Sequence, residues 1–168
     1  MQRVMIIGGP GSGKSTLARA LGKKFGLPVT HIDQLQFGFG WVEVDPAKRD
    51  AQVRKVVARE SWIIDGNYSS TAEDRMTRAD TLIWLDIPLW HRLWRVARRT
   101  LKYYGQSRPD LPAGCPERFS VEFILYILSS NKRQKAKAAD RYTTMSQEAQ
   151  AVHLRSSRDV QMFLEQLA

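Results

Sequence analysis

Short apolar runs alternate along the chain with segments in which apolar residues recur every three or four positions. The runs are rich in β-branched residues. They do not show the alternation of apolar and polar residues that is typical of a strand with one face in water. Such runs are typical of strands buried on both faces of a parallel sheet. Five of them predict strands, over residues 3–7, 29–33, 61–65, 81–87 and 151–154.

The segments between these strands have helical spacing and helix-ending signals. Leu17, Leu21 and Phe25 mark one face of a helix over residues 14–25, which Gly26 is expected to end. Strands that alternate with helices indicate an α/β fold. Further helices are predicted after Asp45-Pro46, over about 90–102, from Ser120 to Asn131 and after Ser157.

The turn between the first strand and the first helix matches the pattern G-x-x-x-x-G-K-[ST]. Glycines permit dihedrals that a Cβ disfavours, so successive N–H groups can point at phosphate oxygens at the positive end of the helix. Lys14 adds a charge for the β- and γ-phosphates, and Ser15 adds a hydroxyl for Mg²⁺. A glycine-rich turn without a ligand is the alternative. The residues expected to bind the nucleotide are Gly8, Gly9, Pro10, Gly11, Ser12, Gly13, Lys14, Ser15 and Thr16.

Carboxylates follow three of the predicted strands. Ligands of open parallel sheets bind beyond the carboxyl ends of strands, so Asp33 is a candidate for orienting an acceptor or for a water-mediated contact with Mg²⁺. A turn or capping role is the alternative. Asp65 ends an apolar run as in a Walker B element, and we expect it to hold Mg²⁺ together with Ser15. Asp86 is a rival for this role. His31 is at least as well explained by a hydrogen-bonded structural role as by a functional one.

The net charge of +9 is concentrated in one part of the chain. Residues 92–141 contain twelve basic side chains against four acidic ones, which favours an anionic partner, either a nucleotide or a nucleic-acid backbone. Arg92, Arg95 and Arg99 share one helix face, where they repel one another unless an anion joins them. We expect Arg95 and Arg99 to form a phosphate clamp, and a solvated charged face is the alternative.

Two segments are expected to cover the crevice. Residues 34–44 are aromatic without periodicity, which indicates a mobile loop over a flat ligand. Residues 103–119 are broken by prolines and glycines, and long connections of this kind are often lids. We place the lid at about 100–119, within one domain over 1–168. Arg75, after the third strand, is expected either to meet an anionic acceptor or to face water.

Composition narrows the cellular setting. No apolar run approaches the eighteen residues of a membrane span, so no membrane contact is expected. The single cysteine, Cys115, can form neither an internal disulfide nor a cysteine zinc site. A reduced, cytoplasmic setting is expected, for a monomer or a homodimer.

Five motifs can be compared with known families: G-x-x-G-S-G-K-S-T-L-A at Gly8 to Ala18, H-I-D at His31 to Asp33, I-D-G-N-Y at Ile64 to Tyr68, R-P-D at Arg108 to Asp110 and G-C-P-E at Gly114 to Glu117. Together they resemble the adenylate-kinase-like P-loop kinases, and most closely the bacterial proteins labelled "DNA topology modulation protein". The resemblance covers nearly the whole chain.

This resemblance implies a three-layer α/β/α P-loop NTPase fold. Its five-stranded parallel sheet has the strand order 2-3-1-4-5 and carries a lid after strand 4, and its cofactors are ATP and Mg²⁺. Asp65 matches the aspartate of the D-G-F-P-R element of nucleotide kinases. Asn67 and Tyr68 stand where that element has Phe-Pro, which helps to shape a nucleoside monophosphate site. The resemblance therefore does not name the acceptor.

The leading hypothesis is a kinase that moves the γ-phosphoryl group of ATP to a small anionic acceptor, either nucleotide- or nucleoside-like or another metabolite. Its expected catalytic residues are Lys14, Asp33, Arg95 and Arg99. Positioning and charge neutralisation supply nearly all the catalysis in this reaction class. The competing hypothesis is a nucleic-acid-associated ATP-binding protein that uses residues 92–141. A polynucleotide end kinase would unite the two.

Overall fold

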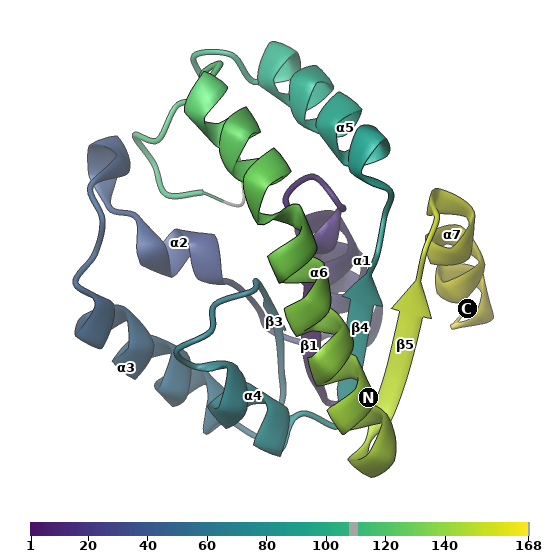
Figure 1. Ribbon diagram of the computed structural model, residues 1–168. Coiled ribbons are helices and arrows are strands. Elements are labelled where there is room, and N and C mark those ends of the chain that lie inside the picture. Colours follow the sequence, from purple (N-terminus) through teal and green to yellow (C-terminus); the bar gives the residue numbers. More distant parts are fainter. Residues whose placement is uncertain (108–110, 168) are drawn as a thin grey trace.

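The computed structural model describes residues 1–107 and 111–167 (Figure 1). Its centre is a parallel five-stranded sheet of order β2-β3-β1-β4-β5, which confirms the predicted topology. The strands are β1 (Arg3–Gly8), β2 (Val29–His31), β3 (Trp62–Asp65), β4 (Thr81–Leu85) and β5 (Gln150–Leu154). The helices are α1 (Lys14–Phe25), α2 (Ile32–Gln36), α3 (Pro46–Val57), α4 (Ala72–Arg78), α5 (Leu89–Lys102), α6 (Val121–Glu148) and α7 (Ser157–Gln166), with a 3₁₀ turn at Phe39–Trp41.

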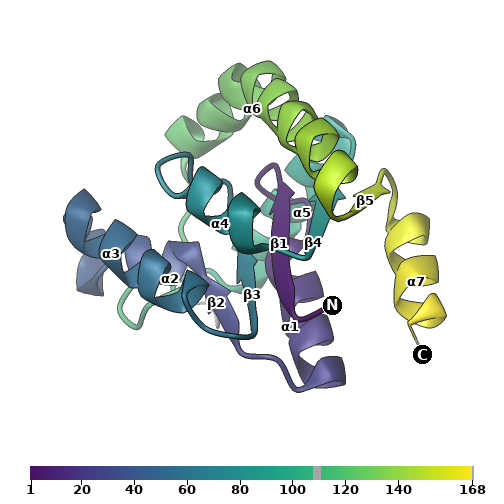
Figure 2. The ribbon, with the colours of Figure 1, turned by 90° about the horizontal axis from the view of Figure 1, so that it is seen from below.

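Helices cover both faces of the sheet, which gives the predicted three layers (Figure 2). Successive side chains of a strand point to opposite faces. Ile6 and Ile83 belong to the core formed with α1 and α7, whereas Met5 and Leu82 belong to the core formed with α3, α4 and α6. Because helices cover both faces, the central strands β1, β3 and β4 are almost entirely buried and mostly apolar, whereas the edge strands β2 and β5 are only partly buried.

The second strand is shorter than predicted. β2 ends at His31, and the residues from Ile32 onward form α2 rather than extending the strand over 29–33. The last residue pair between β2 and β3 is His31 with Asp65. The chain leaves β3 immediately afterwards, at Gly66, where φ is 137°. Since β3 offers no further partners, the chain satisfies its backbone groups in a helix. Asp33 therefore lies in the first turn of α2.

Helix α5 has its arginine-rich face on the inside and its apolar face outward. Arg92, Val96 and Thr100 are buried. Trp90 and Trp94, one turn apart, are 66% and 57% exposed. The amphipathic helix therefore brings the guanidinium groups of Arg92 and Arg95, rather than aromatic rings, to the glycine loop before α1.

The segment after α5, which we predict to be a lid, packs against the aromatic segment after α2. The backbone N–H of Gly40 donates to the carbonyl oxygen of Gly114 (3.1 Å). The buried Cys115 thiol donates to the carbonyl oxygen of Gly38 (3.2 Å). The R-P-D motif at 108–110 lies outside the described residues. Among the helices of the described residues, none combines the length and the apolar character that crossing a membrane requires.

Candidate functional site

The glycine loop lies between β1 and α1, where its sequence predicts it. Gly11 and Gly13 have φ values of 77° and 99°, a left-handed conformation that side chains disfavour. Gly8 is needed for space, because a Cβ there would lie 2.6 Å from the backbone carbonyl oxygen of Leu85. Such a loop at the N-terminus of an α-helix is a ready anion-binding site.

Lys14 is held within this loop. Its ammonium group donates to the carbonyl oxygen of Gly9 (3.2 Å). Burial lowers the pKa of Lys14, and the nearby carboxylates of Asp65 and Asp33 offset part of this shift, while Arg92 adds to it. A bound phosphate would favour the charged form of the lysine again.

Ser15, Asp65 and His31 form a chain of hydrogen bonds beneath the loop. The Ser15 hydroxyl donates to Oδ2 of Asp65 (2.7 Å), and Nδ1 of His31 contacts Oδ1 of the same carboxylate (2.5 Å). The Asp65 side chain is buried at the carboxyl end of β3. The structure thus brings together the two residues that we predict to hold Mg²⁺.

Asp86 lies in a different environment. Nζ of Lys135 donates to its Oδ2 (2.9 Å), and Nε2 of His153 lies 3.3 Å from the same oxygen. The rival carboxylate is therefore occupied by side chains of α6 and β5, whereas Asp65 has the contact with Ser15.

Asn67 connects β3 to the glycine loop. Its amide nitrogen donates to the carbonyl oxygen of Gly8 (2.8 Å), and its amide oxygen accepts from the N–H of Gly8 (3.0 Å). This paired contact explains why an asparagine follows Gly66, a role that the I-D-G-N-Y motif alone does not reveal. The loop and the end of β3 are fixed relative to each other.

The two arginines of the predicted phosphate clamp line the cavity beside the loop. Nη1 of Arg95 donates to the carbonyl oxygen of Ser12 (2.9 Å), and Nη2 donates to the Ser157 hydroxyl (2.8 Å). Arg99 pairs with Glu117 of the predicted lid, with its Nη2 3.0 Å from Oε1. Their role toward phosphate stays a prediction.

A cavity of about 1220 Å³ lies next to the loop. Residues Pro10 to Thr16 line one side, and Asp33 of α2 also lines the cavity. α6 contributes three cations at four-residue spacing, Arg133, Lys137 and Arg141. They belong to the basic segment 92–141, and their spacing is the signal in the sequence that places them on one helix face.

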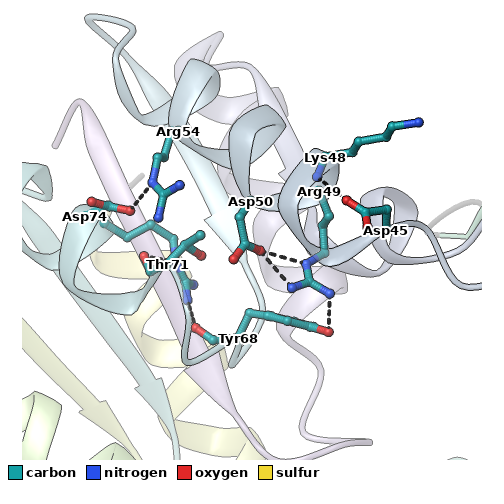
Figure 3. Close-up of polar contacts among 9 residues, drawn as sticks. Asp45, Lys48, Arg49, Asp50, Arg54, Tyr68, Thr71 and Asp74 are labelled. Atoms are coloured by element: carbon teal, nitrogen blue, oxygen red, sulfur yellow. Dashed lines mark hydrogen bonds and ion pairs between the residues drawn. The ribbon is translucent and has the colours of Figure 1, made fainter.

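Arg49 of α3 also lines this cavity, although no motif in the sequence marks this residue. Its guanidinium lies between Asp50 and the Tyr68 hydroxyl (Figure 3), and Nη2 donates to Oδ1 of Asp50 (2.7 Å). The Arg49 side chain is buried. Its pairing with Tyr68 connects α3 to the loop after β3, and no short-range pattern in the sequence signals such a contact.

Arg75 neither lines this cavity nor faces water, so neither expectation for it is correct. It is fully buried in α4 and donates to the carbonyl oxygens of Gly66, Tyr68 and Thr71. Burial, together with the charge of nearby Arg141, lowers the pKa of Arg75 to about 9. Its contacts fix the loop that follows β3 and leave the guanidinium no surface for an acceptor.

The donor set at the loop fits a magnesium ion held together with nucleotide phosphates. Ser15 and Asp65 supply a hydroxyl and a carboxylate in contact, and Mg²⁺ is usually bound by one or two protein oxygens plus phosphates and water. In the part of the chain that the structure describes, no three His, Cys, Asp or Glu side chains gather into a metal-binding group. The sparse oxygen set is of the kind that suits Mg²⁺.

The sheet order, the glycine loop and the buried carboxylate of β3 define a P-loop NTPase-like fold. Comparison with known proteins agrees with this class. Residues 4–64 match the family described as "ATPase family associated with various cellular activities (AAA)".

Among solved structures, the chain is similar to shikimate kinase from Acinetobacter baumannii, a structure in complex with shikimate. The TM-score is 0.62 at 13% sequence identity, over 99% of this chain and 91% of the other. No curated protein sequence matches the chain significantly. These likenesses establish the fold, and the narrower resemblance to the DNA topology modulation proteins stays a prediction.

Proposed function

We propose that this protein is a magnesium-dependent kinase that transfers the γ-phosphoryl group of ATP to a small anionic acceptor. The observation that carries the proposal is the contact between Ser15 and Asp65, directly beside the loop and a large cavity. A Walker A hydroxyl next to a buried carboxylate is the donor pair that P-loop enzymes use around a nucleotide-bound metal ion.

The size of the cavity supports a reaction with two substrates. Its volume of about 1220 Å³ exceeds the roughly 300–1,000 Å³ of ordinary single-ligand pockets. ATP phosphates would lie along the loop residues 9–16. The opposite side, formed by α2, α3 and α6, is left for the acceptor.

The residues of the loop would hold ATP by charge and hydrogen bonding. Lys14 would neutralise the β- and γ-phosphates, and Ser15 and Asp65 would hold Mg²⁺, which would supply positive charge to the transferred group. Arg95 and Arg99 line the same cavity, and their role in this proposal is to stabilise the charge that builds on that group. For Arg99 this role requires that the guanidinium exchange part of its contact with Glu117 for phosphate.

The acceptor side combines one carboxylate with several cations. Asp33 can accept a hydrogen bond from the acceptor hydroxyl and so orient it for attack. Arg133, Lys137 and Arg141 supply positive charge across the cavity, which favours an acceptor with anionic groups. Arg49 is paired with Asp50 and Tyr68, so it shapes the wall more than it adds charge.

The test is a screen of nucleosides, nucleotides and small phosphorylated or carboxylated metabolites with labelled ATP. Lys14→Ala should lower phosphoryl transfer to the acceptor found by about 10²-fold or more, because its charge acts on the transferred group. Circular dichroism checks the fold of the variant. Transfer at the wild-type rate in a folded variant would remove the loop from the mechanism.

A nucleic-acid acceptor is the second candidate, and one observation favours it. Trp90 and Trp94 are exposed on α5, and the Arg98 guanidinium lies 5.4 Å from the Trp94 ring, which combines stacking surfaces with positive charge. A protein that binds the backbone of a nucleic acid loses affinity steeply as salt is raised, with a slope set by the phosphates it neutralises. Binding of single-stranded oligonucleotides at several salt concentrations therefore separates a polynucleotide acceptor from a small one.

A further inference from the structure

His31 and Asp65 are paired across two neighbouring strands. They are opposite each other at the carboxyl ends of β2 and β3, and both are buried, with 6% and 3% of their surface exposed. Nδ1 of His31 lies 2.5 Å from Oδ1 of Asp65. Burying a carboxyl group costs free energy unless its oxygens are hydrogen-bonded, so the contact with His31 offsets part of the cost of burying Asp65.

The direction of the hydrogen bond follows from the chemistry of the partners. An ionised carboxylate can only accept, so the contact requires a proton on Nδ1 of His31. The other oxygen of Asp65, Oδ2, accepts from the Ser15 hydroxyl at 2.7 Å. Each carboxylate oxygen therefore accepts from a different donor. The two contacts fix the rotation of the carboxylate about χ2, a torsion angle that is only weakly restricted by itself.

We propose that His31 is a positioning residue for Asp65. By occupying Oδ1 it keeps Oδ2 turned toward Ser15 and the phosphate loop, which is the side where the metal would bind. This inference rests on the proposed function, since it needs Asp65 to serve a nucleotide-bound metal ion. Partners that orient a metal-binding carboxylate typically change metal affinity by about 10–100-fold when they are removed.

A second histidine–carboxylate pair in the same molecule provides the control. His153 lies 3.3 Å from Asp86, but that carboxylate also accepts from Lys135, and the His153 ring is stacked on Trp84 with the centroids 4.0 Å apart. Phenylalanine at either position removes the polar contact and keeps a flat ring. Only the substitution at His31 touches the carboxylate next to Ser15.

The experiment measures metal binding separately from catalysis. Mn²⁺ binding to the protein with a non-hydrolysable ATP analogue is followed by electron paramagnetic resonance, and analogue binding is measured again in EDTA. We expect His31→Phe to weaken Mn²⁺ binding about 10–100-fold while metal-free analogue binding changes less than about threefold. His153→Phe should bind Mn²⁺ like the wild type.

Asparagine and glutamine distinguish positioning from a general need for a polar residue. In His31→Asn the introduced side-chain amide nitrogen can take the place of Nδ1, whereas His31→Gln places its amide nearer to the position of Nε2. We expect His31→Asn to recover most of the Mn²⁺ affinity and His31→Gln to recover little. This pair also decides the question if His31→Phe fails to fold.

The outcomes separate this inference from the proposed function. If the wild type binds no Mn²⁺ with the nucleotide analogue, the proposed function fails and this inference fails with it. If the wild type binds Mn²⁺ and His31→Phe binds it equally well, or the asparagine and glutamine variants bind alike, His31 is a core residue only. The proposed kinase activity would then stand without it.

Discussion

Asp65 ends β3, and Asp86 directly follows β4 on the other side of β1. The two aspartates differ mainly in the side chains that contact them. Asp65 accepts from a hydroxyl of the phosphate loop, and Asp86 accepts from Lys135 and lies beside His153. A metal ion needs a carboxylate whose charge is not already neutralised by an ammonium group. At the scale of single residues, these contacts favour Asp65 over Asp86 for the magnesium role.

The first prediction compares these two carboxylates. Asp65→Asn should lower Mg²⁺-dependent phosphoryl transfer on the order of 10²-fold, because the amide cannot supply the negative charge that the metal requires. Asp86→Asn should change transfer less than about threefold and act mainly on stability through Lys135. Steady-state rates at several Mg²⁺ concentrations measure both effects, and the opposite ranking would assign the metal to Asp86.

At the scale of elements, one buried carboxylate of the predicted lid contacts the end of α5. Glu117 is buried, accepts from Arg99 at 3.0 Å and accepts from the Thr100 hydroxyl at 3.0 Å. Its backbone N–H donates to the carbonyl oxygen of Gln106. The end of α5 and the segment before α6 are therefore connected through a residue that also contacts a cavity-lining arginine.

The second prediction concerns this connection. Glu117→Gln should remove the negative charge that faces the Arg99 guanidinium, at a cost of about 1–3 kcal/mol, so amide exchange over residues 103–107 and 111–118 should speed up roughly tenfold. Hydrogen exchange with mass spectrometry measures this, and ATP with an acceptor should slow the exchange again. Glu122→Gln, a change at an exposed acid in α6, is the matched control. Equal exchange in both variants would show that Glu117 does not hold the segment.

Local patterns predict most elements but not how they face one another. The spacing of Leu17, Leu21 and Phe25 and the terminal Gly26 predict α1 with the bounds that the structure shows. The early end of β2 depends on where β3 stops, which is information from a distant part of the chain. The sequence of α5 predicts an arginine-rich face and an apolar face, but it does not determine which of the two is buried in the fold.

The same distinction applies to the candidate site. The phosphate loop is a local motif, so its residues and its place between a strand and a helix could be predicted from the sequence. The contacts of Asp65 with His31 and of Asn67 with Gly8 join residues 34 and 59 positions apart. Only the fold brings such residues together, and no spacing rule in the sequence reveals them.

At the scale of the whole molecule, the edge strand β5 packs against β4 and α6 through a group of ring side chains. Trp84, on the face covered by α6, stacks on His153 with the ring planes 1° apart, and Tyr142 of α6 lies over the same pair. Nε2 of His153 faces Asp86, while Nε of Arg155 donates to Nδ1 (3.4 Å). A ring nitrogen that accepts carries no proton, so these contacts suit the neutral imidazole.

The last prediction follows from this packing. Burial lowers the pKa of His153 below its ordinary value of 6.5, and the contact with Asp86 offsets only part of the shift. Because the folded state binds the proton less readily than the unfolded state, stability is complete above the unfolded pKa and is lost as the pH falls below about 6.5. His153→Phe keeps a stacking ring on Trp84 and cannot titrate, so it should lose less stability than the wild type between pH 7.5 and 5. Urea unfolding at both values measures the difference, and equal losses would mean that another group, not His153, couples folding to protons in this range.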